Sequence, residues 1–251
     1  MGVQGETGIW HYTAARWREA WMVWRAAPVL YSALTFVPSA VFVAIDVTRN
    51  GLPASTLLFA AGMAAELALI LLTTWWAFAA TMAALHETPG SSLSQLPRLL
   101  HRGLLQSPRL MLPSILQSLL ILFALLLLIV PGILLSVLLS LTYYVAYIEQ
   151  PPKPGGALAR SRDLIHREAG WSIFVSGLLY VMLVPLFMLI EALGFLGLQF
   201  IVIPLGFGVA SVVDSFTIVL FYRYYQDLAA QPAHTDDGAS ENFSQPPTAQ
   251  A

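Results

Sequence analysis

The sequence has no cysteine and very little charge. The lack of cysteine excludes disulfides, thiolate nucleophiles and cysteine metal sites. Charged residues make up 10% of the chain, whereas a soluble domain usually carries about 25%. Because 57% of the residues are hydrophobic and the mean hydropathy is +0.71, too few charges remain to cover a water-facing surface. We therefore expect lipid to cover much of this protein.

Long uncharged stretches predict membrane-spanning helices. Residues 26–45 contain no charge, and at about 1.5 Å per residue a helix of that length crosses a hydrocarbon core about 30 Å thick. Three further apolar stretches follow, at residues 51–85, 110–148 and 169–222. The stretch 110–148 is about twice the length of one span, and the stretch 169–222 is longer still. We therefore expect an all-α polytopic membrane protein with six transmembrane helices, arranged as three hairpins over residues 27–228.

The third and fourth spans are expected to meet at Pro131 and Gly132. This pair lies near the middle of the uncharged stretch 110–148, and a Pro-Gly dipeptide is a strong turn signal. The sequence thus predicts helices over residues 111–130 and 132–149, joined by a very tight turn.

The positions of the basic residues predict the orientation. In the six-span topology, eleven of the twelve lysines and arginines fall on one side, and only Arg49 falls on the other. The positive-inside rule then places that side in the cytoplasm. We expect a multi-pass protein of the cell (inner or plasma) membrane with both termini cytoplasmic. Residues 1–26 would form an interfacial helix, and the polar tail 229–251 should be disordered because it cannot bury enough apolar surface.

A basic segment precedes each hairpin, and each segment is expected to form a helix at the inner interface. In the third segment, one face collects Ala157, Leu158, Ser161, Leu164 and Ile165. In the second, Leu93, Leu96, Leu99, Leu100 and Leu104 oppose Arg98, His101 and Arg102; in the first, Trp10, Trp17, Trp21 and Trp24 form a stripe. Such helices lie flat with arginines toward anionic headgroups. The alternative is basic loops that only set orientation. The candidate headgroup contacts are Arg98, Arg102, Arg160, Arg162 and Arg167.

Acidic residues inside the spans form a candidate intramembrane polar site. Glu66 and Asp214 fall within the second and sixth spans, and Glu191 lies toward the outer end of the fifth. An ionised carboxylate in hydrocarbon is unfavourable, so such residues usually face the bundle interior, become protonated or line a pathway. Two interpretations stay open: protonated acids that join helices, or a pathway for a cation or proton.

Several short segments resemble a known bacterial membrane domain. They are Ile129-Val130-Pro131-Gly132-Ile133-Leu134, then Gly156-Ala157-Leu158-Ala159-Arg160-Ser161, Trp171, and the closing Phe221-Tyr222-Arg223-Tyr224-Tyr225-Gln226-Asp227-Leu228. Over roughly residues 12–228 the chain looks like the six-span domain that precedes some glycerophosphodiester phosphodiesterases and also occurs alone with unknown function. The enzymatic barrel of that family needs roughly 250 further residues, so the resemblance implies no phosphodiesterase activity here.

No catalytic motif is legible, and the histidines lack metal-ligand spacing. We therefore expect a membrane protein without enzymatic activity, cofactor or metal, acting as a lipid- or envelope-associated scaffold or accessory subunit. The expected partners are membrane lipids with anionic headgroups and not nucleic acid; a protein partner or a homo-oligomer is left open. The alternative is a transporter or channel component for a small solute, cation or proton that uses Glu66 and Asp214.

Overall fold

The computed structural model describes residues 4–49, 56–87, 92–165, 167–181 and 199–231. All regular elements within these ranges are helices, so the all-α fold class is confirmed. The predicted disordered tail lies almost wholly outside the described residues. The main helices are α1 (Gln4–Trp24), α2 (Pro28–Arg49), α3 (Thr56–Met82), α4 (Leu96–Gln106), α5 (Pro108–Leu127), α6 (Ile129–Leu138), α7 (Thr142–Ile148), α8 (Pro154–Leu164), α9 (Arg167–Val181) and α11 (Gln199–Ala230).

Two helical stretches in the described part are long and apolar enough to cross a membrane, Pro108–Leu127 and Ile129–Ile148. They form the hairpin of α5 and α6, with α7 continuing beyond a short break. Only 17% of the apolar window in the first stretch is buried, whereas the core helix of a soluble protein would be mostly buried. Leu126 near the hairpin tip is 76% exposed. The other four predicted spans stay a prediction.

The hairpin turn differs from the predicted one. The chain reverses at Leu128, whose backbone is extended (φ −159°, ψ 131°), and α6 begins at the next residue. Pro131 therefore lies in the first turn of α6 instead of in the loop. Proline is tolerated there because the first N–H groups of a helix have no intrahelical partner. Gly132 is buried against α5: an added Cβ would lie 2.9 Å from the Cα of Leu125 and overlap its side chain.

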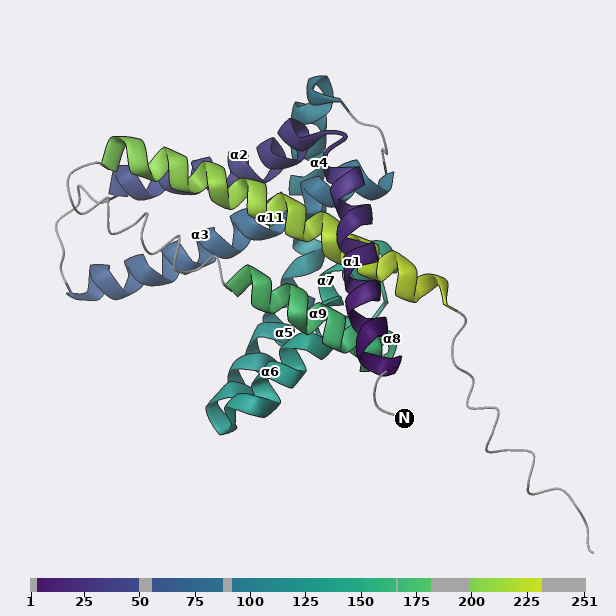
Figure 1. Cartoon of the computed structure of the whole chain (residues 1–251). Helices are drawn as coiled ribbons and strands as arrows, with labels where there is room; N and C mark the ends of the chain where they lie inside the picture. Colours follow the sequence, from purple (N-terminus) through teal and green to yellow (C-terminus); the bar gives the residue numbers. More distant parts are fainter. Residues whose placement is uncertain (1–3, 50–55, 88–91, 166, 182–198, 232–251) are drawn as a thin grey trace, which may run out of the picture.

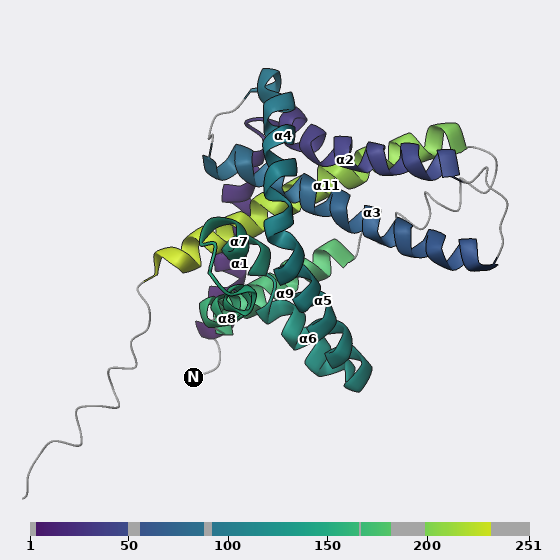
Figure 2. The same cartoon turned by 180° about the vertical axis from the view of Figure 1, so that it is seen from behind.

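The helices radiate from a common hub (Figures 1 and 2). In both views α2, α3 and α11 run alongside one another to one side, while the α5–α6 hairpin points in another direction. Residue contacts also join α2 to α3 and to α11. The buried core lies mainly at the hub, where α4, α7, α8 and the ends of α3 and α11 meet. We call this meeting region the hub. Its charged and aromatic side chains lie in the best-packed part of the protein.

The amphipathic helices of the hub agree with the sequence pattern in part. All five residues of the predicted apolar face of α8 are buried. On α4, Leu99 is buried, whereas Leu93, which precedes the helix, and Leu104 are each about half exposed. Close packing of α4 on α3 depends on Gly103, because an added Cβ there would lie only 2.5–2.6 Å from the backbone N and Cα of Ala80.

Candidate functional site: a charged and aromatic hub

Glu87 is the centre of the first charged cluster. It is the last residue of a π-helical turn, Ala83–Glu87, that extends α3. The hydroxyl of Tyr147 on α7 donates to its carboxylate at 2.6 Å, and the amide of Gln106 donates at 2.9 Å. The guanidinium of Arg102 on α4 forms an ion pair with it at 2.6 Å. One carboxylate therefore joins α3, α4 and α7.

The surroundings of Glu87 keep it ionised. Partial burial raises the pKa of its carboxyl group, but the hydrogen bonds from Tyr147 and Gln106 and the nearby charges of Arg102 and His86 lower the pKa by more. The net pKa lies below the ordinary value of 4.5. A general acid at neutral pH needs a raised pKa, so Glu87 suits a structural ion pair and not proton donation.

Two further clusters have the same composition. Glu149, just after α7, accepts a hydrogen bond from the hydroxyl of Tyr225 at 3.1 Å and pairs with Arg160 of α8 at 3.3 Å. The third carboxylate belongs to the end of α11. Asp227 accepts from the hydroxyl of Tyr12 at 2.7 Å and pairs with Arg16 of α1 at 3.3 Å.

The three clusters around the hub have the same arrangement of residues. Each contains an acid at the end of a long helical stretch, a tyrosine hydroxyl, and an arginine from one of the basic segments α1, α4 or α8. Tyr147, which donates to Glu87, lies two residues before Glu149 of the second cluster. Tyr225, which donates to Glu149, lies two residues before Asp227 of the third cluster. Each hairpin end is thus tied to a neighbour, which links the three predicted hairpins.

A network of hydrogen bonds joins α1 to α9 and α11. The hydroxyl groups of Thr13 and Ser172 lie 2.7 Å apart, and that of Tyr224 lies 2.6 Å from Ser172 and 3.1 Å from Ser176. The indole of Trp17 donates to Ser176 at 3.0 Å. Because these groups come from α1, α9 and α11 and are largely buried, their hydrogen bonds fix α1 across the other two helices.

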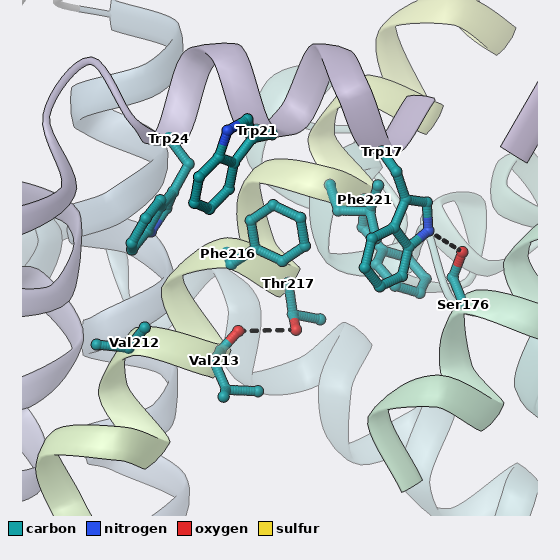
Figure 3. Close-up of a pocket in the computed structure, with 10 residues that line it drawn as sticks. Trp17, Trp21, Trp24, Ser176, Val212, Val213, Phe216, Thr217 and Phe221 are labelled. Carbon is teal, nitrogen blue, oxygen red and sulfur yellow. Dashed lines mark hydrogen bonds between the residues drawn. The ribbon is translucent and has the colours of Figure 1, made fainter. Parts of the chain in front are cut away.

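An aromatic groove, lined by Trp17, Trp21, Trp24 and Phe216, lies between α1 and α11 (Figure 3). Its volume is about 220 Å³. The rings of Trp21 and Trp24 stack at 5.4 Å, and that of Trp17 lies 5.4 Å from Phe216. The predicted tryptophan stripe is therefore confirmed for three of its members as one face of α1. Trp10 lies apart and is 63% exposed.

Of the three predicted intramembrane acids, the structure describes the side chain of Asp214 alone, so their grouping stays a prediction. Asp214 is half-buried on α11 and lines neither this groove nor a second apolar pocket beside α2. Glu66 belongs to α3, but its side chain lies outside the described residues, as does Glu191 altogether. Among the described residues, no group of three or more His, Cys, Asp or Glu side chains could hold a metal ion.

Most of the predicted headgroup contacts have intramolecular partners instead. Arg102 pairs with Glu87 and Arg160 with Glu149, while Arg162 pairs with the adjacent Asp163 at 2.9 Å. Arg98 is exposed, and the side chain of Arg167 lies outside the described residues. The side chains of Arg102, Arg160 and Arg162 are nevertheless 43%, 44% and 66% exposed, so the headgroup contacts stay a prediction.

The three carboxylates that organise the hub are not among the predicted site residues. The predicted acids belong to the expected spans, whereas Glu87, Glu149 and Asp227 lie at helix ends beside basic segments. The recurring Tyr-x-acid pattern at Tyr147–Glu149 and Tyr225–Asp227 is the one signal that could have indicated them. No protein family model, curated protein or solved structure matches this chain, so the resemblance to the phosphodiesterase-associated domain stays a hypothesis.

Proposed function

We propose that this chain is an integral membrane protein that acts without catalysis, as a scaffold that associates with anionic lipids at the cytoplasmic face. In this account six spans cross the cell membrane, both termini are cytoplasmic, and the hub lies at the inner interface. The protein then presents α1, α4 and α8 to the headgroup layer as a fixed, basic framework.

One observation carries this proposal: the exposed apolar surface lies on the α5–α6 hairpin, and the charged residues lie away from its tip. The α5–α6 hairpin exposes leucines on most of its surface, including Leu119, Leu122 and Leu126. In water such a patch would be unusually large for a monomer. The arginines and carboxylates described above gather at the opposite end of this hairpin. A lipid tail region and a headgroup region accommodate these two surfaces.

The hub favours a framework over an enzyme because its acids already have partners. The carboxylates of Glu87, Glu149 and Asp227 each pair with an arginine and accept from a tyrosine. Such pairs fix the relative positions of helices and leave no acid–base or nucleophile arrangement among the described residues of the hub.

Extraction of the full-length protein with its surrounding lipid tests this function. Polymer discs would be cut from cells that express the protein, and their lipids compared with those of the bulk membrane. We expect enrichment of anionic phospholipid in the discs. Arg98→Gln, which removes an exposed charge on α4, should reduce the enrichment. Discs whose lipid composition equals that of the membrane would contradict the proposal.

The transport alternative rests on Glu66 and Asp214, acids within the long apolar helices α3 and α11. Its test is a flux measurement in proteoliposomes with the native chain and the Asp214→Asn variant. The scaffold account predicts proton and cation fluxes no greater than those of empty vesicles in both cases. A flux that the native chain supports and Asp214→Asn abolishes would favour the transporter.

A further inference from the structure

The aromatic groove adjoins a second apolar pocket. That pocket has a volume of about 390 Å³ and lies between α2 and α11, with Val29 and Phe36 in its wall. Trp24 and Val212 line both spaces. The two spaces therefore adjoin along the side of α11, from under α1 toward the middle of α2, and we refer to the pair as the apolar channel.

Apart from the indole N–H of Trp21, the polar side chains of the groove wall are already hydrogen-bonded within the protein. The indole of Trp17 donates to Ser176, and that of Trp24 donates to Ser215 at 2.9 Å. Thr217 donates to the carbonyl of Val213, as Figure 3 also shows. A polar ligand would gain few hydrogen bonds here. The lining suits a flexible hydrocarbon chain.

A hydrocarbon lining alone would not select a lipid, because bilayer tails are as apolar as the groove. Basic residues adjacent in sequence to the groove tryptophans supply the selection. Arg18 lies on α1 directly after Trp17, and Arg25 lies in the turn after α1, directly after Trp24. Both are exposed, and neither has an ion pair with any residue that the structure describes. This distinguishes them from Arg16, which pairs with Asp227.

Trp21 connects the two parts of the site. Its ring lines the groove, while Figure 3 shows its indole nitrogen on the side of the ring away from Phe216. The side chain is 50% exposed, and within the described part of the chain its N–H has no hydrogen-bond acceptor. Indole groups at the membrane interface commonly combine an apolar body with such a polar edge.

We propose that this channel binds one acyl chain of an anionic glycerophospholipid whose phosphate lies at Arg18 and Arg25. This site rests on the proposed function, since it requires the hub to lie at a lipid interface. It adds a defined ligand class and a defined position, on α1 instead of on the arginines of α4 and α8 that carboxylates occupy.

Quenching of tryptophan fluorescence tests the site. The full-length chain would be placed in phosphatidylcholine vesicles with an equal fraction of lipid brominated on its acyl chain, either phosphatidylglycerol or phosphatidylcholine. Three of the seven tryptophans line the groove, so a bound brominated chain quenches a substantial part of the signal. We expect stronger quenching by brominated phosphatidylglycerol than by brominated phosphatidylcholine.

Matched variants locate the effect. Arg18→Gln with Arg25→Gln should bring the two quenching levels together, whereas Arg109→Gln with Lys153→Gln, an equal loss of exposed charge, should keep them apart. Val212→Phe, at the junction of the two pockets, should weaken quenching by brominated phosphatidylglycerol without changing charge. Equal quenching by both lipids in the native chain, or a difference that survives either groove variant, would overturn the site alone. No quenching by either lipid would overturn the proposed function as well.

Discussion

Glu87 shows how one carboxylate can join several helical elements. Its partners come from three elements, and its pKa lies below 4.5 because Tyr147, Gln106, Arg102 and His86 together outweigh the effect of partial burial. Hydrogen bonds to a charged group contribute more than neutral ones. Removal of the charge should therefore loosen the contacts of α3 with α4 and α7.

We predict that Glu87→Gln lowers the free energy of unfolding at neutral pH by about 1–3 kcal/mol. Because the folded-state pKa of Glu87 is lowered, its contribution is complete above the unfolded pKa and is lost as pH falls through the folded pKa. The difference between the native chain and the variant should thus shrink as pH drops below about 4.5. Thermal unfolding in detergent across this range measures it.

The control for this prediction is Asp163→Asn. Asp163 also pairs with an arginine, but both partners are more than half exposed. Such surface pairs contribute about 0–1 kcal/mol, so this variant should behave like the native chain. A difference between the native chain and Glu87→Gln that stays constant with pH would contradict the role assigned to the carboxylate.

Gly103 provides a second test at the residue scale. A methyl group there would overlap the backbone of Ala80, which cannot move without shifting α3. We predict that Gly103→Ala destabilises the protein by about 1–3 kcal/mol, as overpacking does. Gly177→Ala is the matched control, since nothing lies within 4 Å of its added Cβ. That variant should be neutral or stabilising by up to about 1 kcal/mol, as thermal unfolding would show.

At the scale of elements, a charged substitution in the α5–α6 hairpin tests whether lipid or water surrounds it. Leu119 lies past the middle of α5 and is 57% exposed. We predict that Leu119→Asp opposes insertion by about 3 kcal/mol, because aspartate is unfavourable at the centre of a membrane helix. Insertion of the full chain, followed by protease protection of the hairpin, measures the effect.

Leu119→Ile keeps the side chain apolar and should insert like the native chain. If the hairpin instead faced water, Leu119→Asp would be harmless and could raise solubility. Normal insertion of Leu119→Asp, or a soluble and folded variant, would contradict the position assigned to α5.

The presence of several helices could be predicted from the sequence, whereas some of their boundaries and side-chain contacts could not. The uncharged stretch 110–148 correctly indicated a hairpin because apolar length is a strong signal. The turn was misplaced by three residues because Pro131 is also compatible with the first turn of a helix. Amphipathic spacing found the buried face of α8. It could not reveal that Arg102 and Arg160 are paired, because their acids belong to other helices.

At the scale of the whole molecule, three similar clusters tie the ends of the long helices to the basic segments. Glu87, Glu149 and Asp227 lie 62 and 78 residues apart in the sequence, yet each has the same kinds of partner. This recurrence matches the three basic segments that precede the predicted hairpins. The chain has few charged residues, and the three clusters concentrate many of them in one hub. The hub fixes α1 in place and, with α1, the aromatic groove.

The most direct test of the account is the sidedness of its two ends. The native chain has no cysteine, so single cysteines can be introduced at Arg98 and Arg162 in the hub and at Ile129 in the hairpin tip. With a maleimide that does not cross membranes, intact cells should show labelling at position 129 alone, and positions 98 and 162 should react only after permeabilisation. Labelling of positions 98 and 129 from the same side of an intact membrane would contradict the account.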